Sequence, residues 1–89
     1  MKAIVSVIGA DKRGIIAKIS DALWKMDINI EDISQTIMQN FFTMTMLVDL
    51  SEATLSFDEI AANLTECGKE IGVDTRIQSE AIFYAMHRI

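Results

Sequence analysis

The stretch Ile-Gly-Ala-Asp-Lys-Arg-Gly-Ile-Ile-Ala-Lys-Ile, residues 8–19, joins an apolar strand to a one-sided helix, and the rest of the chain is organised around it. Gly14 stands where the helix begins. Backbone N–H groups at a helix start have no partner within the helix and carry the positive end of its dipole, so they can hold an anion or a carbonyl oxygen. Lys12 and Arg13 would oppose that dipole in a first helical turn. This arrangement favours a site for an anionic ligand.

The same residues also fit an ordinary turn between a strand and a helix. Asp11 can be the N-cap residue and accept hydrogen bonds from the N–H groups of Arg13 or Gly14. Gly14 can serve only to bring the helix close to the sheet, and Lys12 and Arg13 can be solvated. The residues alone leave the ligand site and the ordinary turn both open.

The elements on either side of this stretch follow from their apolar spacing. Residues 2–8 are β-branched and almost continuously apolar, which is typical of a central strand. Residues 14–26 carry apolar side chains at the three-four spacing of a helix with one buried side. A second strand begins at Ile28, but its apolar face changes after Ile30. This shift predicts a β-bulge or a strand start near Glu31, or else a strand with both faces half covered.

The second half of the chain repeats the pattern of the first. Two residues, Gln39 and Asn40, separate the second strand from a third over 41–50, which predicts a tight hairpin. Ser56 with Glu59 forms a capping box that opens a second helix, and Gly72 provides a left-handed stop. Residues 73–78 alternate as a fourth strand. The tail, residues 79–89, has helical spacing at Ile82, Phe83, Met86 and Ile89.

The element order is therefore strand, helix, strand, strand, helix, strand. Two split βαβ units with right-handed crossovers predict an α+β, ferredoxin-like βαββαβ sandwich, with a four-stranded antiparallel sheet and two helices on one face. We expect residues 1–78 to form this domain and residues 79–89 to form a short C-terminal helical extension. The extension is expected to pack on the sheet face that the other helices leave open, or on a partner subunit.

Length and composition restrict the class of protein. The 89 residues are 51% hydrophobic, which suits one globular domain whose thin core would gain from dimerisation. No apolar run is long enough to cross a bilayer and no signal-peptide pattern is present, so we expect a cytoplasmic protein without membrane contact. The net charge of −5, without a basic stripe, argues against nucleic-acid binding. One cysteine excludes an internal disulfide.

The sequence lacks a recognisable catalytic centre. His87 is the only histidine and has no Cys or second His near it, and Cys67 falls on the buried side of the second helix. Four carboxylates are expected near one end of the sheet, where caps and solvated turns are commoner than an acid–base pair or a metal site: Asp11, Asp27, Glu31 and Asp32. We therefore predict no enzyme activity, no metal and no cofactor. Trp24, beside the apolar stripe of the first helix, is a candidate interface residue.

At these residues the chain resembles the ACT domain family. The resemblance rests on Ala-Ile-Val-Ser-Val-Ile-Gly at 3–9, on Asp-Lys-Arg-Gly-Ile-Ile-Ala-Lys-Ile at 11–19, and on Asp-Ile-Asn-Ile at 27–30, and it spans residues 2–78. The chain is most similar to the short stand-alone ACT proteins, and it also resembles the ACT repeats of glycine-cleavage regulators. The resemblance implies a regulatory, small-molecule-sensing domain.

ACT domains typically pair side by side into an eight-stranded sheet and bind an amino acid at the interface. The resemblance places the ligand against the loop after the first strand and the start of the second, with Asp11, Gly14 and Asn29 at the matching positions. The implied ligand-binding residues are Gly9, Ala10, Asp11, Lys12, Arg13, Gly14, Ile15, Asn29 and Ile30. Gly9 stands where some serine-sensing members have histidine, and Arg13 where many have proline, so the resemblance does not carry serine binding over.

The leading hypothesis is a non-catalytic homodimer that binds a small amino acid or related anionic metabolite and signals to a regulated protein partner. A zwitterionic amino acid suits it physically, because its carboxylate fits a helix N-terminus and its ammonium fits Asp11 or a carbonyl oxygen. The alternative is a ligand-free module for protein–protein interaction or assembly. A small enzyme of the same fold would need a proton-transfer pair that the sequence does not show.

Overall fold

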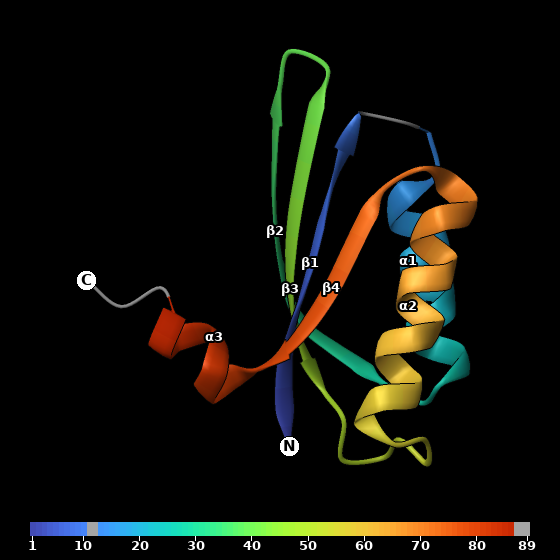
Figure 1. The fold of residues 1–89 in the computed structure, drawn as a ribbon, viewed down its shortest axis with the longest axis vertical. Coiled ribbons are helices and arrows are strands. Elements are labelled where there is room, and N and C mark those ends of the chain that lie inside the picture. Colours follow the sequence, from blue (N-terminus) through green and yellow to red (C-terminus); the bar gives the residue numbers. More distant parts are fainter. Residues whose placement is uncertain (11–12, 87–89) are drawn as a thin grey trace.

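A computed structural model describes residues 1–10 and 13–86, and it has the predicted element order. The four strands form one antiparallel sheet in the order β2-β3-β1-β4, with α1 and α2 on one face and α3 on the other (Figure 1). This confirms the ferredoxin-like sandwich with its short C-terminal helix. The elements are β1 Lys2–Ala10, α1 Ile15–Lys25, β2 Asn29–Met38, β3 Phe41–Asp49, α2 Phe57–Ile71, β4 Asp74–Ser79 and α3 Glu80–Met86.

The core lies between the sheet and the two long helices. Alternate residues of β1 and β3 point toward the helices and are fully buried, as alternation in a strand requires. Each helix supplies the three-four stripe that the sequence predicts. The largest fully buried side chains are Ile19, Leu23, Met44, Met46, Ile60, Leu64, Val5, Val7 and Val48.

Helix α2 begins and ends as its sequence predicts. Ser56 Oγ accepts from the N–H of Glu59 while the Glu59 carboxylate accepts from the N–H of Ser56, and Gly72 ends the helix at φ 74°. Gly68 brings α2 close to β4, because a Cβ atom there would lie 2.5 Å from Oγ1 of Thr75. The approach of α2 to the sheet thus depends on one residue without a side chain.

Strand β2 contains the predicted bulge. Its pairing with β3 shifts register between Ile30 and Asp32, which leaves Glu31 as the extra residue. The Glu31 carboxylate lies 2.8 Å from the Lys2 ammonium. Of the alternatives for the phase shift in this strand, the bulge is therefore the one observed.

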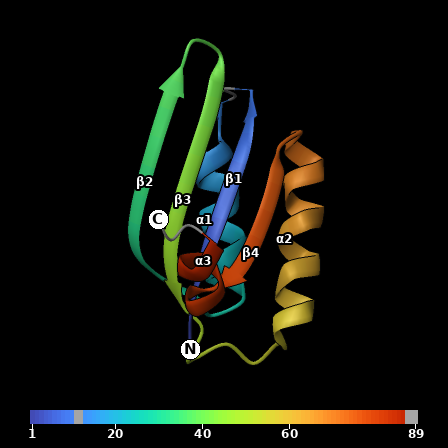
Figure 2. The ribbon, with the colours of Figure 1, turned by 60° about the vertical axis from the view of Figure 1, so that its left-hand side comes forward.

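Helix α3 lies against the sheet face that α1 and α2 leave open. Phe83 and Tyr84 of α3 line a small hollow together with sheet residues that include Ile4 and Leu47. Ile4 is buried although its side chain is on this face. Figure 2 shows α3 in front of one end of the sheet, with the hairpin end left bare. Of the two positions predicted for the tail, this contact with the chain's own sheet is seen.

Among the described residues, no helix has the length and apolarity needed to span a membrane.

Candidate ligand site at the beginning of α1

Gly14 forms the N-cap of α1 in a left-handed conformation, at φ 85° and ψ 5°. The first helical hydrogen bond runs from the N–H of Lys18 to the carbonyl of Gly14, at 2.9 Å. The N–H groups of residues 15–17 therefore have no partner within the helix. Glycine cannot cap them with a side chain, so they are available to an acceptor from outside the helix.

This geometry corrects two expectations. Asp11 is not the N-cap residue, because Gly14 holds that position. Arg13 lies in the turn before the helix rather than in its first turn, so it does not oppose the dipole in the way the sequence suggested. The strand and the helix also differ slightly from prediction: β1 continues to Ala10, and α1 begins only at Ile15. Asp11 and Lys12 themselves lie outside the described residues.

A groove of about 320 Å³ opens beside this helix terminus. Its walls come from the first turn of α1, from the edge strand β2 and from its neighbour β3. The lining residues are Gly14, Ile15, Ile16, Ala17, Gln35, Ile37 and Phe42. The groove thus combines backbone donors that have no partner within the helix, apolar walls and one side-chain amide, which together suit a small molecule with an anionic end and an apolar body.

The surface around the groove is unusually apolar for a solvent-exposed region. Ile33 and Ile37 lie on the helix side of β2, and they are 40% and 57% exposed. Ile16 in the groove is 39% exposed, and Trp24, eight residues farther along α1 and outside the groove lining, is 74% exposed. Every residue of β2 except Ile30 is exposed, and β2 is an edge strand. The β2 side of the molecule therefore exposes both apolar side chains and the unpaired edge of a strand.

Asn29 and Ile30 lie at the other end of the sheet from the groove. Asn29 pairs with Asp49, which pairs with Lys2 at the start of β1, whereas Ala10 at the end of β1 pairs with Phe41. Eight residue steps along β1 separate these two ends by about 26 Å. Within one chain, the two halves of the predicted ligand site are therefore not brought together.

The same topology corrects the expected grouping of carboxylates. Glu31 and Asp32 lie near the start of β2, at the end of the sheet away from Ala10 and Gly14. They therefore cannot gather with residues of the loop after β1, and the expectation that these four carboxylates share one end of the sheet is wrong.

The electrostatics at the start of β2 are local. The Glu31 carboxylate accepts a hydrogen bond from the Lys2 ammonium and raises the pKa of Lys2. The backbone N–H of Ser51 donates to Oδ1 of Asp49 at 3.0 Å and lowers the pKa of that carboxyl. Both shifts come from ordinary surface hydrogen bonds, and neither indicates a proton-transfer pair.

The remaining predicted residues are distributed as follows. Gly9 is half-buried and Ala10 is exposed at the end of β1, while Cys67 is partly buried against the core. Burial raises the pKa of the Cys67 thiol, with a further contribution from Glu70. Within residues 1–10 and 13–86, no three or more His, Cys, Asp or Glu residues gather in a way that could hold a metal ion. His87 lies outside this part of the chain.

Sequence analysis missed three residues that line the groove, namely Gln35, Ile37 and Phe42. A usable signal was present at Ile33 and Ile37. The two residues form the apolar face of β2 after the shift at Ile30, and both remain exposed in the structure. An apolar edge strand without a covering helix is a sign of a site or an interface.

These features define a class of protein. It is a small ferredoxin-like domain with an exposed edge strand and a groove at the start of its first helix. The chain matches the ACT domain family over residues 2–78, and it belongs to that family. It is 57% identical to a UPF0237 protein of Clostridium acetobutylicum, and the match covers all of both chains.

Solved structures agree with this assignment. An ACT domain protein from Streptococcus pneumoniae is 40% identical to the chain, with a TM-score of 0.82 and 93% of each chain covered. A structure described as a putative glycine cleavage system transcriptional repressor has a TM-score of 0.75 at 19% identity, over 86% of this chain and 44% of its own. That second likeness shows the fold alone. ACT domains are typically regulatory domains that bind ligands.

Proposed function

We propose that the chain is a non-catalytic sensor that pairs side by side through β2 and binds a small amino acid or related anionic metabolite between the two copies. One observation carries this proposal. Ala10 and Gly14 lie at one end of the sheet and Asn29 at the other, so one chain holds two half-sites rather than one site.

Antiparallel pairing of two β2 strands would join these half-sites. A two-fold axis through the middle of β2 sets the start of each β2 beside the end of the other. The partner's Asn29 would then approach the end of the sheet where Gly14 and the groove lie. Each pair of chains would contain two composite sites, and neither site would be complete in a single chain.

The same pairing accounts for the exposed β2 side of the molecule. The open edge of β2 would be hydrogen-bonded to its copy, which removes the row of unpaired backbone groups that edge strands expose. The two α1 helices would lie on either side of the joined β2 strands. Ile16 of α1 and Ile33 and Ile37 of β2, which are partly or largely exposed in the single chain, would be covered between them. Burial of apolar surface favours the pair by about 25 cal/mol per Å².

The groove suggests which end of the ligand goes where. The N–H groups of residues 15–17, which have no partner within the helix, suit a carboxylate, and the Gln35 amide can donate or accept beside it. Ile16, Ile37 and Phe42 suit an apolar side chain better than a hydroxyl. We therefore expect a ligand with an apolar rather than a strongly polar side chain.

A thermal-shift screen against the twenty amino acids tests ligand binding. A ligand at a hundred times its Kd should raise the free energy of unfolding by about 2.7 kcal/mol. Asn29→Ala and Asp11→Ala should each abolish the shift, whereas Asp58→Ala, on the first turn of α2, should leave it intact.

Mixed dimers test the composite geometry. An Asp11→Ala chain paired with an Asn29→Ala chain has both changes in one site and none in the other, so each mixed dimer should bind one ligand instead of two. In an equimolar mixture that pairs at random, roughly half of the dimers are mixed, so mixing two inactive variants should restore about a quarter of the normal binding. A mixture that binds nothing, when each unaltered pair binds two ligands, would contradict a site shared between chains.

A second candidate function is a ligand-free assembly module, and Trp24 favours it. This tryptophan is 74% exposed on α1, and exposed aromatic residues are enriched at interfaces. A flat screen together with loss of the dimer in Trp24→Ala would support assembly over sensing. For both candidate functions we propose that the protein acts in the cytoplasm. It would pass on its state through the geometry of the dimer or through contact with a regulated protein.

A further inference from the structure

The open face of the sheet carries a second apolar surface, at the opposite side from the groove. Cross-strand pairing sets its residues in two rows at the hairpin end: Thr36, Thr43 and Ile8 form one row, and Met38, Phe41 and Ala10 form the next. We call these six residues the uncharged patch.

The patch has the composition of an interface core rather than of a solvated sheet face. Charged residues make up 24% of the chain, yet none of the six is charged. Ile8, Met38 and Phe41 are 41%, 70% and 57% exposed. The solvated face of an antiparallel sheet is normally polar, and interface cores are enriched in aromatic residues and Met and depleted of charge.

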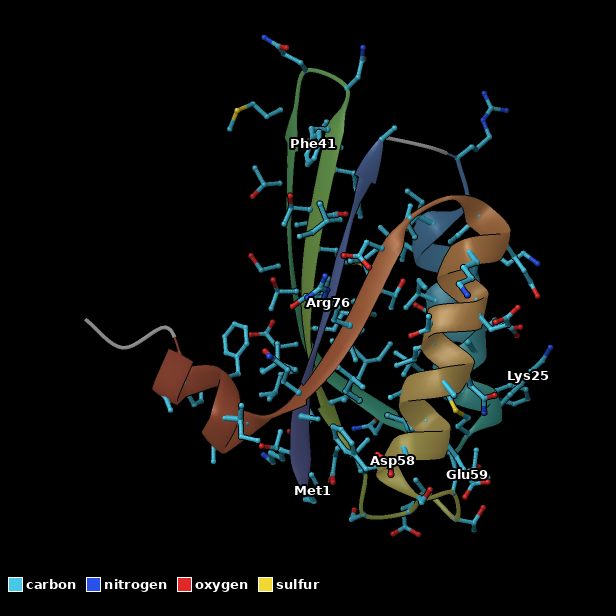
Figure 3. All side chains as sticks on the ribbon, viewed as in Figure 1. Met1, Lys25, Phe41, Asp58, Glu59 and Arg76 are labelled. Carbon is cyan, nitrogen blue, oxygen red and sulfur yellow. The ribbon has the colours of Figure 1, made fainter. Side chains whose placement is uncertain are left out.

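The borders of the patch are formed by paired charges and by α3. Asp74, opposite Ile8 on β4, accepts a hydrogen bond from Nε of Arg76 at 3.2 Å, so these two charges are paired. Arg76 is labelled in Figure 3. At the other end Phe83 and Tyr84 of α3 stand on the sheet beside Thr45 and Leu47. The open face therefore has the shape of a step, with a raised end at α3 and a low end at Phe41, where the six residues of the uncharged patch lie (Figures 2 and 3).

A step of this kind is complementary to itself. Turning one copy by 180° and laying it on another places the raised α3 end of each over the low end of the other, which is the geometry of an isologous two-fold contact. The chain carries a net charge of −5, so most of its surface repels a second copy. Two uncharged patches meet without that repulsion.

The surface area of the chain leaves room for contacts with other copies. The accessible area is 5877 Å², whereas a monomeric protein of this mass, 9.9 kDa, is expected to expose about 5,200 Å². Contacts along β2 and on the open face would both cover part of this excess. Edge pairing through β2 leaves the patch uncovered, because side-by-side sheets keep their open faces on the same side.

We propose that the uncharged patch and α3 form a self-association interface, through which a second copy of this chain packs on the open face of the sheet. The contact is independent of pairing along β2. Where both contacts form, they combine two side-by-side pairs into a four-chain assembly.

Two substitutions at the low end of the step test the contact by light scattering and sedimentation velocity. Ile8→Arg with Phe41→Arg brings like charges together at the two-fold contact, and the mass of the assembly should fall to half that of the unaltered chain. Thr65→Arg, on the exposed side of α2, is the matched control and should leave the mass unchanged. An arginine variant with the mass of the unaltered chain, or an unaltered chain that stays monomeric, overturns the proposal.

Oxidation of methionine tests the contact in the unaltered chain, without any substitution. Met38 lies in the patch and is 70% exposed in the single chain. Raising the protein concentration should slow its oxidation by hydrogen peroxide. Equal rates for Met38 at low and high concentration would show that no second copy covers the patch.

Discussion

Gly9 on β1 packs directly against Val73, the residue before β4. A Cβ atom at position 9 would lie 2.8 Å from Cγ1 of Val73 and 3.1 Å from its Cβ. The glycine is therefore required for packing on the helix side of the sheet. The position where the family resemblance places a histidine in serine-sensing members has no room for a side chain in this protein, which supports a ligand other than serine in the proposed site.

Gly9→Ala should destabilise the protein by about 1–3 kcal/mol, because overpacking a tight contact forces its neighbours to move. Val73→Ala removes Cγ1, the nearer of the two atoms that the new methyl group meets, and keeps the Cβ atom. The double variant should therefore be more stable than the sum of the two single effects predicts, with a coupling of about 0.5–3 kcal/mol. Urea unfolding of the four proteins measures the cycle, and strict additivity would show that the contact is not what constrains position 9.

Thr75 is the buried polar residue on the inner side of β4. It is 4% exposed, and its hydroxyl makes no hydrogen bond to the described part of the chain. Thr75→Val keeps the shape of the side chain and removes the unpaired group, so the free energy of unfolding should rise by about 1 kcal/mol. Thr65→Val on the exposed side of α2 is the control, and little change is expected there. A loss of stability in Thr75→Val would indicate that the hydroxyl is hydrogen-bonded after all.

Local signals explain how much of this fold could be predicted from the sequence. The capping box at Ser56 and Glu59 and the stop at Gly72 depend on a few adjacent residues, and they were predicted correctly. The bulge at Glu31 was detectable because a one-residue shift changes which face of a strand is apolar. These features need no knowledge of distant contacts.

The features that sequence analysis missed depend on contacts between distant residues. Met38 and Phe41 form one row of the open face only because β2 pairs with β3, and Ala10 joins them through β1. The N-cap of α1 moved from Asp11 to Gly14 because the chain enters the helix through a left-handed residue. Aspartate is a good N-cap by composition, but backbone conformation decides which residue takes that position.

The hydrogen bond at Asp49 predicts a dependence of stability on acid. The Ser51 N–H lowers the pKa of Asp49 in the folded chain below its ordinary value of 3.8. A depressed folded pKa contributes stability above the unfolded pKa, and this contribution is lost as the pH falls through the folded pKa. The advantage in stability of the unaltered chain over Asp49→Asn should be constant from pH 7 to about 5 and should shrink below pH 4.

Urea unfolding of both proteins between pH 2.5 and 7 measures this difference. Asn at position 49 can still accept the bond from Ser51 but does not titrate, so it isolates the effect of the charge. A difference that stays constant down to the lowest pH would contradict the role of the Asp49 charge.

Cys67 should be a slow nucleophile in the folded protein. Burial against the core raises its pKa above the ordinary value of 9.0, and its thiol donates weakly to the carbonyl of Lys18 at 3.8 Å. The thiolate is the reactive form, so iodoacetamide at pH 8 should alkylate the folded chain more slowly than the same chain in denaturing urea. The pH of half-maximal reactivity should also be higher in the folded chain. Glu70→Gln removes the nearby carboxylate and should lower that pH slightly, whereas Glu52→Gln, in the loop before α2, should leave it unchanged. A folded chain that reacts as fast as the denatured one would show that Cys67 is open to solvent and that its thiol is not held against the core.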